Sequence, residues 1–321
     1  MRSVVVVGSY NQDHVWVGEE LPASGATRSG RYLSGPGGKG FNQAVASARS
    51  GAGTTFLVAL GDDLAAQQAR ALATGCGIDL VDEVHDGIAT GSAGIFVDAR
   101  GRNAIVVAPG ANAAFSTAFV EREAQRIRNA AVVLAQLEVD RDAVFRALSI
   151  ARESGRRTLL NPAPADAVVD ELLLELADLA TPNETEFAAL CQHVLGERVR
   201  ADDIASTPSS ELHALCRRLH KGSVAITLGS AGCFISHADA AAFNDTAASY
   251  RVAAIKANAI DTTGAGDAFN GALAAELARD PQQPLAQALR YASSYAGLAT
   301  ERRGAALAMP TRADVEQRLA G

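Results

Sequence analysis

Short apolar runs alternate along the chain with longer stretches of helical pattern. Five runs have the length of a buried strand: residues 4–7, 56–60, 132–137, 158–160 and 224–227. Stretches such as residues 42–50 and 142–153 lie between them and have the length and spacing of helices. Strands that are apolar throughout are typical of a parallel sheet covered on both faces. The pattern predicts a large three-layer α/β fold with a mostly parallel central sheet.

Two regions break this alternation. Residues 14–36 and 90–108 contain strand-like segments separated by turns, with no room for crossover helices. We expect them to form a small antiparallel sheet, a lid beside the main sheet. The end of the chain is predicted to be helical, at residues 264–277, 285–301 and 311–319. Since no repeat or low-complexity linker interrupts the pattern, residues 1–321 are expected to form one domain with these lid segments.

Charge and cysteine usage narrow the class of protein. The net charge is −7 and no run of Lys or Arg occurs, which argues against a nucleic-acid partner. No apolar segment reaches the roughly 18 residues of a membrane span, and the N-terminal run is too short for a signal peptide. Four cysteines without CxxC spacing fit reduced thiols, so we expect a cytoplasmic protein. His213, Cys216 and His220 would share a helical face as metal ligands sometimes do, but without a fourth ligand an ordinary amphipathic helix is favoured.

The stretch DTTGAGDAFNG, residues 261–271, carries the most chemical information. Gly264 and Gly266 leave backbone N–H groups uncovered at a predicted helix start, where they can form an anion hole. Asp267 follows directly and can accept the proton of an attacking hydroxyl. The alternative is that Asp267 is simply a helix N-cap, and the flanking glycines favour the catalytic interpretation.

A second glycine-rich stretch is GPGGKGFN, residues 35–42. Its glycines match GxGxxG, but that fingerprint must follow the first strand, which here ends at Gly8. It is not a Walker A loop either, because Lys39 is followed by Gly40 rather than by Ser or Thr. What remains is a flexible loop whose glycines let the backbone come close to a ligand. Its one cation, Lys39, and its one side-chain amide, Asn42, suit a polyhydroxylated ligand. The alternative is a plain turn.

Further polar residues lie at the C-terminal ends of predicted strands, the edge where open α/β sheets bind ligands. They are Asn11, Asp13, Glu138, Asn161, Asn183 and Glu186. Taken alone, Asn183 and Glu186 also fit a helix-capping pair, and on those two residues alone we would favour capping.

Seven motifs in order, GSxNxDH, GGKGxNQA, QLE, LNPAPA, PNETE, TLGSxG and DTTGAGDAFNG, resemble those of the ribokinase-like carbohydrate kinases. The resemblance runs from about residue 4 to residue 310. It implies a large α/β domain with a small β lid. The implied activity is ATP-dependent phosphorylation of a sugar hydroxyl, with D-ribose to ribose 5-phosphate as the leading reaction. The alternative within the family is another sugar or a nucleoside.

The resemblance also implies a role for each matching residue. Asp267 would be the base, with the amides of Gly264, Ala265 and Gly266 as the anion hole. The sugar-binding positions would be Asn11, Asp13, Gly38, Lys39, Asn42 and Glu138. Mg²⁺ and phosphate would be organised by Asn183 and Glu186, and the nucleotide would lie near Thr227 and Gly229. K⁺ would be held by Asp261, Thr263, Ala299, Arg302 and Gly304.

Two residues depart from the family pattern. Phe41 stands where an alanine is usual, and its ring would either narrow the sugar pocket or pack into the helix. Ala308 stands where relatives often carry a serine, so a K⁺ ligand would be lost unless this position has no part in the ion site. The physiological sugar therefore stays open, as does the strength of the cation site.

Other classes of function have less support. A sugar sensor without catalysis would lack the base, but Asp267 is present. A nicotinamide-dependent oxidoreductase would rest on the misplaced glycine match alone. Lid strands with an exposed edge make a homodimer through the lid the expected assembly.

Overall fold

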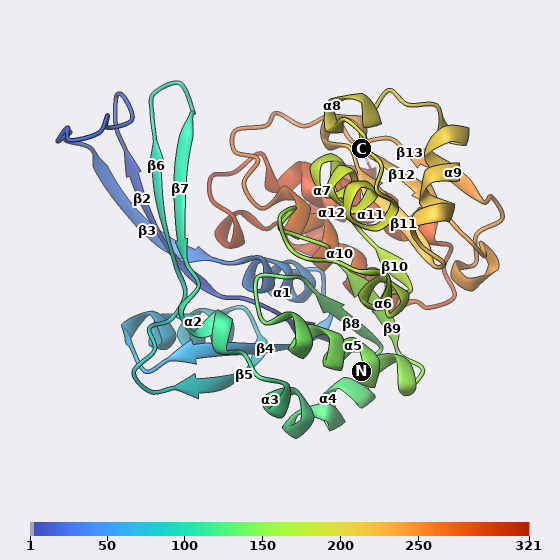
Figure 1. Cartoon of the computed structure of the whole chain (residues 1–321), viewed down its shortest axis with the longest axis horizontal. Helices are drawn as coiled ribbons and strands as arrows, with labels where there is room; N and C mark the ends of the chain where they lie inside the picture. The colour runs from blue at the N-terminus through green and yellow to red at the C-terminus, as the bar shows by residue number, and fades with distance from the viewer. Residues whose placement is uncertain (1–2, 321) are drawn as a thin grey trace.

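A nine-stranded sheet forms the centre of the computed structural model, which describes residues 3–320 (Figure 1). In spatial order its strands are β13 (Ser249–Val252), β12 (Cys233–Ser236), β11 (Ser223–Thr227), β10 (Leu179–Ala180), β9 (Arg157–Leu160), β8 (Val132–Ala135), β1 (Ser3–Val7), β4 (Gly53–Gly61) and β5 (Ile78–His85). The strands from β11 to β5 pair in parallel, and only β12, which pairs antiparallel with both β11 and β13, runs in the opposite direction. The predicted mostly parallel sheet is confirmed.

Helices cover both faces of this sheet. One face carries α1 (Lys39–Arg49), α2 (Leu64–Gly75), α10 (Ala265–Arg279), α11 (Leu285–Ala299) and α12 (Arg312–Ala320). The other carries α3 (Thr117–Arg122), α4 (Ala124–Asn129), α5 (Arg141–Glu153), α6 (Glu171–Glu175), α7 (Glu184–Leu190), α8 (Ala201–Ile204) and α9 (Ser209–Leu219). Strand β1 shows why two cores form: Val4 and Val6 pack into the first, and Val5 and Val7 into the second. The expected three layers are therefore present.

Short helical turns complete the connections. They are η1 (Gly110–Ala114), η2 (Cys191–Leu195), η3 (Gly229–Ala231), η4 (Ala241–Phe243) and η5 (Ala306–Ala308). Within the described residues, no helix is both long and apolar enough to cross a membrane.

A separate four-stranded sheet, which we call the lid, projects from the body of the molecule (Figure 1). Its spatial order is β3 (Arg31–Gly37), β2 (Asn11–Val17), β6 (Ser92–Val97) and β7 (Asn103–Ala108). The expected small sheet at residues 14–36 and 90–108 is therefore present. Its two outer pairs are antiparallel as expected, but the central pair β2–β6 is parallel, so the lid is mixed. The reason is that the hairpins β2–β3 and β6–β7 both extend from the carboxyl ends of the parallel strands. Their first strands, β2 and β6, therefore run in the same direction where they pair.

The predicted elements differ from the observed ones mainly at their ends. The run expected to be a strand over 132–137 stops at Ala135 and is followed by the buried polar residue Gln136. Helix α11 ends at Ala299 rather than at residue 301, and α10 extends to Arg279. These ends matter because the polar residues that follow β1, β8, β9 and β10 all meet at one edge.

Candidate active site

Glycines let the loop between β3 and α1 lie directly against the end of β1. Gly38 has φ 86°, and a Cβ on it would lie 2.7 Å from the Asn11 backbone nitrogen. A Cβ on Gly40 would lie 2.5 Å from the Ser9 backbone nitrogen. A side chain at either position would force the loop away. The loop is the close-approach segment that the sequence predicts, and it brings Lys39 at the start of α1 to the edge of the large sheet.

Asp267 lies in the first turn of α10, with only 7% of its surface exposed. Its Oδ2 accepts a hydrogen bond from Asn42 Nδ2 at 2.9 Å, and its Oδ1 accepts one from Gln43 Nε2 at 3.0 Å. Burial raises the pKa of Asp267, while Lys39 and the two amide donors act in the opposite direction. The residue is not the N-cap of α10, which is Gly264, so the capping interpretation of Asp267 is wrong.

The start of α10 provides the proposed anion hole. Gly264 has a left-handed backbone with φ 74°, which allows the chain to turn sharply into the helix. The first-turn N–H groups of a helix have no intrahelical acceptor, and the helix dipole favours an anion there. One of the three proposed amides is already used, because Ala265 N donates to the Thr262 carbonyl at 3.2 Å. The amides of Gly264 and Gly266 are the better candidates for an anion.

Glu138 lies just beyond β8 and is fixed by two donors. Its Oε2 accepts from Ser9 Oγ at 2.6 Å and from the Lys39 backbone nitrogen at 2.9 Å. Ser9 was not identified as a site residue from the sequence, although it belongs to the GSxNxDH motif. Its function here is to join the end of β1 to the glycine loop and to Glu138, since it also accepts from Gly40 N at 3.3 Å.

Asp13 and Asn11 contribute the polar groups at the root of the lid. Burial, together with the charge of Glu138, raises the pKa of Asp13 to about 6. The carboxylate lies close against Gly37, where a Cβ would come within 2.2 Å of Oδ2. Asn11 Oδ1 accepts from Asn112 Nδ2 at 2.9 Å. Asn112 was missed from the sequence because it follows the second lid hairpin, about a hundred residues away.

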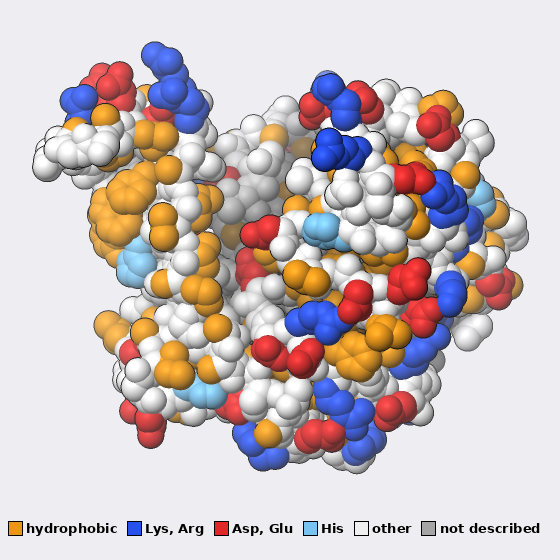
Figure 2. Space-filling model, viewed as in Figure 1, with side chains coloured by type: hydrophobic (Ala, Val, Ile, Leu, Met, Phe, Trp, Pro, Cys, Tyr) orange, Lys and Arg blue, Asp and Glu red, His pale blue; other side chains and the backbone are white. Residues whose placement is uncertain are grey.

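The charge of the Lys39 side chain interacts with several carboxylates of the cleft. Burial lowers the pKa of Lys39, but the charges of Asp267, Glu138 and Glu186 outweigh that effect and raise the pKa overall. The side chain is therefore a cation, and three carboxylates from different parts of the sequence act on it. The groove between the lid and the body, in which acidic side chains are visible, is seen in Figure 2.

Asn183 and Glu186 form the capping box that the sequence also allows. Glu186 N donates to Asn183 Oδ1 at 2.8 Å, and Asn183 N donates to Glu186 Oε2 at 2.9 Å. Glu186 is nevertheless buried, and burial raises its pKa. Asn161 Nδ2 reaches the same oxygen at 3.5 Å. The pair thus caps α7 while it holds a carboxylate at the binding edge of the sheet.

A cavity of about 670 Å³ adjoins the start of α10. Its lining includes Thr227, Gly229 and Asn183, together with Gly266 and other residues of α10 and α11. The two predicted nucleotide positions therefore line one cavity together with Gly266, one of the glycines of the predicted anion hole. The size fits a small organic ligand.

The predicted cation residues meet around Asp261. Its Oδ1 accepts from Thr263 N and its Oδ2 from Gly304 N, each at 3.0 Å, so one carboxylate joins two distant loops. Arg302 N donates to the Ala299 carbonyl at 3.3 Å. Ala308 lies in η5 and is buried. Asp261 thus joins Thr263 and Gly304, and Ala299 and Arg302 form a second pair; their role in holding K⁺ stays a prediction.

Two other sequence questions are resolved by packing. Phe41 is buried in the core, where it packs edge-on against Tyr10 with ring centroids 5.2 Å apart, so it does not narrow the pocket. His213 pairs with Ser236 Oγ at 2.8 Å, and Cys216 is fully buried. Residues 3–320 contain no cluster of His, Cys, Asp and Glu side chains suited to a metal ion. The helix-packing interpretation of this cluster fits these contacts.

Comparisons with known proteins agree with this geometry. The family model of the pfkB family carbohydrate kinases matches residues 1–312. The ribokinase of Haemophilus influenzae is 35% identical over 316 residues, which cover 97% of this chain and 96% of that protein. The bifunctional ribokinase/ribose-5-phosphate isomerase A of Fructilactobacillus sanfranciscensis is 38% identical over 97% of this chain, which spans only 55% of that protein. The structure of Arabidopsis thaliana ribokinase complexed with ribose and ATP superposes with a TM-score of 0.86, at 29% identity and full coverage of both chains.

Proposed function

The chain belongs to the pfkB family of carbohydrate kinases, and on that basis we propose that it phosphorylates D-ribose with ATP to give ribose 5-phosphate. Curated relatives of 35% identity over nearly their whole length carry the name ribokinase. The observation that carries the proposal is the buried Asp267, held by two amides at the start of α10 beside the cation Lys39. A buried carboxylate in that place can serve as a base next to an anion hole. We treat residues 1–321 as one ribokinase-like domain with a lid.

The proposed reaction is an in-line transfer. Asp267 accepts the proton of the sugar hydroxyl while that oxygen forms a bond to the γ-phosphorus and the bond to the ADP oxygen breaks. The amides of Gly264 and Gly266 stabilise the negative charge that develops on the phosphoryl group. Lys39 adds a positive charge next to the same cleft. The base then carries the proton, and ADP is the leaving group.

We propose that the sugar lies between the lid root and α1. Its hydroxyls would be bound by Asn11, Asp13, Gly38, Lys39, Asn42 and Glu138. A hydrogen bond from a hydroxyl to a carboxylate is about twice as strong as a neutral one, which favours Asp13 and Glu138 as the discriminating contacts. The nucleotide would occupy the cavity lined by Thr227 and Gly229.

Two cations belong to the proposal. The carboxylate of the buried Glu186 supplies the hard oxygen ligands that Mg²⁺ prefers. Burial raises the pKa of this carboxylate, and a nearby Mg²⁺ would favour its charged form, so the residue fits the ion. When bound with ATP, Mg²⁺ would be held near Asn183 and Glu186 and would neutralise negative charge on the phosphates. Asp261 holds two loops whose carbonyl oxygens suit K⁺, with the set Asp261, Thr263, Ala299, Arg302 and Gly304. Ala308 offers no side-chain oxygen to that set.

We further propose a cytoplasmic homodimer that forms through the lid. Trp16 stacks on Phe96 with ring centroids 5.2 Å apart, and it packs at a tilt against Tyr32 with centroids 5.4 Å apart. Tyr32 is 50% exposed and Val106, on the same face by register, is 71% exposed. An exposed apolar patch on a small sheet is typical of an interaction surface (Figure 2). A monomer by sedimentation at micromolar concentration would contradict this part of the proposal.

The function is tested by ADP release over a panel of pentoses, hexoses and nucleosides. D-ribose should give the highest kcat/KM. Another sugar or a nucleoside as the best substrate would keep the kinase and replace the sugar. If no member of the panel stimulates ADP release, the proposed activity is wrong.

A further inference from the structure

A buried glutamine, Gln43, connects the proposed base to the edge of the large sheet. It is fully buried in α1, and all of its amide is used inside the protein. Its Nε2 donates to Asp267 Oδ1 at 3.0 Å and to Asn161 Oδ1 at 3.1 Å. Its Oε1 accepts from Gln136 Nε2 at 3.1 Å. Two N–H donors and one carbonyl oxygen thus have three partners.

These partners allow only one orientation of the Gln43 amide. If the amide were rotated by 180°, its oxygen would face Asp267 Oδ1 and Asn161 Oδ1, which are both acceptors. Its NH₂ group would then face the Gln136 NH₂ group, and all three hydrogen bonds would be lost. Gly8 makes room for this arrangement, because a Cβ at Gly8 would lie 2.0 Å from Gln136 Oε1. Gly8 at the end of β1 therefore leaves the space that the Gln136 side chain occupies, although Gln136 Oε1 itself has no hydrogen-bond partner within residues 3–320.

The two oxygens of Asp267 have different surroundings. Oδ1 is held by Gln43, whose other partners follow β8 and β9, so it faces the edge of the large sheet. Oδ2 is held by Asn42, which the proposed function places among the sugar contacts. Because the two oxygens of a carboxylate are equivalent, these two donors fix the plane of the group, with one oxygen toward Gln43 and the other toward Asn42.

We propose that Gln43 is a positioning residue that presents Oδ2 of Asp267 to the sugar hydroxyl and keeps the carboxylate ionised. The inference rests on the proposed function, since it assumes that Asp267 is the base. It assigns a role to a residue that does not touch the sugar. The same amide also connects the base to the phosphate side of the cleft, because Asn161 donates to the Thr181 carbonyl at 3.0 Å and to Glu186 Oε2 at 3.5 Å.

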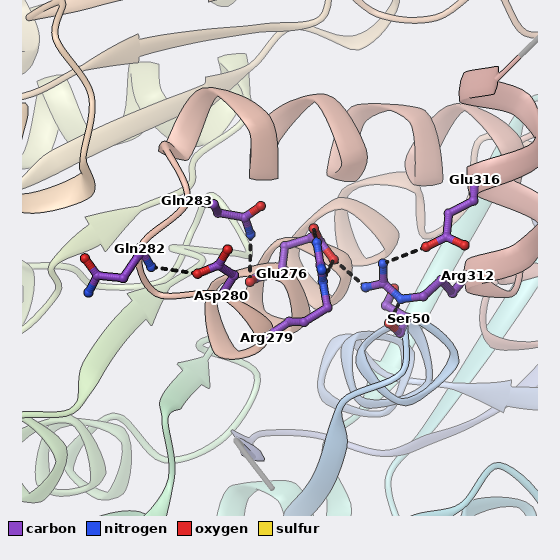
Figure 3. Close-up of polar contacts among 8 residues, drawn as sticks. All are labelled: Ser50, Glu276, Arg279, Asp280, Gln282, Gln283, Arg312 and Glu316. Atoms are coloured by element: carbon purple, nitrogen blue, oxygen red, sulfur yellow. Dashed lines mark hydrogen bonds and ion pairs between the residues drawn. The ribbon is translucent and has the colours of Figure 1, made fainter.

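The experiment compares the pH dependence of kcat for the wild type, Gln43→Met and Gln283→Met. Methionine keeps the length of glutamine but donates no hydrogen bond. Gln283 is a matched control: it is also buried and donates to the Glu276 carbonyl at 2.8 Å, at the far end of α10 (Figure 3). Gln43→Met should lower kcat by up to about 10²-fold, the effect of a small misplacement of a catalytic group. Its KM for ATP should stay unchanged.

The pH profile separates positioning from packing. Loss of a donor to the charged form raises the pKa of a carboxylic acid, so the acid limb of Gln43→Met should move to higher pH. Gln283→Met should keep the wild-type profile. A Gln43→Met enzyme whose profile coincides with that of the control would overturn the proposal, whatever its kcat.

A second variant covers the case in which Gln43→Met does not fold. Gln136→Met leaves both donors of Gln43 in place but removes the group that holds its oxygen. Its acid limb should move in the same direction by a smaller amount, and an unmoved limb would overturn the proposal. Failure of the proposed function has a different signature, because Asp267→Asn would then keep wild-type turnover and the wild-type profile.

Discussion

Asp267 and Asp13 are carboxylates in one cleft, but their surroundings differ. Asp267, at the start of α10, has an amide donor on each oxygen and the cation Lys39 nearby. The carboxylate of Asp13, at the root of the lid, accepts no hydrogen bond from residues 3–320, and Glu138 adds a like charge. The pKa of Asp13 is therefore raised to about 6 by burial and by that charge.

This difference shows which of the two carboxylates is held by the protein itself. Both oxygens of Asp267 accept hydrogen bonds from the body of the protein, although the side-chain oxygens of Asn42 and Gln136 in the same network have no hydrogen-bond partner within residues 3–320. The region of Asp13 holds a carboxylate whose partners must come from outside, and sugar hydroxyls are suitable donors. We therefore expect changes near Asp267 to act on the chemical step, and changes near Asp13 to act on sugar affinity and on stability.

The largest effect should come from Asp267→Asn. The amide cannot accept the proton, so kcat should fall by roughly 10² to 10⁴, while the fold and nucleotide affinity are kept. The measurement is steady-state ADP release with ATP binding by calorimetry in parallel. If Asp267→Asn has turnover close to that of the wild type, Asp267 is not the base. The proposed difference in function between Asp267 and Asp13 would then be wrong.

Glu138→Ala should have the next largest effect, on the sugar side. The loss of a charged acceptor should reduce kcat/KM for the best sugar. The reduction should correspond to a loss of about 1.5 to 3 kcal/mol in transition-state stabilisation. Glu153→Ala is the control, because Glu153 lies at the end of α5 with a largely exposed side chain. If Glu138→Ala leaves KM and kcat unchanged, the proposed ring of sugar contacts is wrong.

Asp13→Asn should weaken sugar binding but stabilise the free protein. The folded pKa of about 6 is above the ordinary value of 3.8, so the wild-type protein loses stability as the pH rises from about 4 to 6. Asparagine has no charge to bury, so the variant should be more stable at pH 7 by at most about 3 kcal/mol, the equivalent of that pKa shift. The gain should vanish below pH 4 in urea unfolding. Equal stability at pH 7 would show that Asp13 is already satisfied.

The smallest effect should come from Ala308→Ser at the proposed K⁺ site. A serine hydroxyl can donate an oxygen to the ion, whereas the methyl group of Ala308 cannot. Activation by K⁺ should occur in both proteins, with a lower half-activating concentration in the variant. Identical concentrations, or no response in either protein, would show that this position has no part in an ion site.

Much of this site could be predicted because its residues lie in short motifs at strand ends. Gly264, Gly266 and Asp267 stand together in the sequence and remain together in α10. The partners of the base could not be predicted in the same way. Gln43 lies 224 residues from Asp267, and its role depends on how α1 packs against α10. Its neighbour Phe41 could be assigned to the core only from its contacts.

The fold shows the same division. Strands β1 and β4 of the large sheet contain continuous apolar runs, at residues 4–7 and 56–60, so their positions follow from composition. The parallel pairing of β2 with β6 brings Asp13 opposite Ala93, eighty residues later. No local sequence pattern predicts this pairing. Asn112 likewise reaches Asn11 only because the second lid hairpin returns beside the first.

The most direct measurement is the identity of the product formed from ATP and D-ribose, followed by phosphorus NMR with correlation to the sugar protons. The account predicts one new phosphomonoester on the C5 oxygen of ribose, formed in equal amount with ADP, and none with Asp267→Asn. Phosphate on another hydroxyl, ADP without a sugar phosphate, or the same product at an undiminished rate from Asp267→Asn would contradict it.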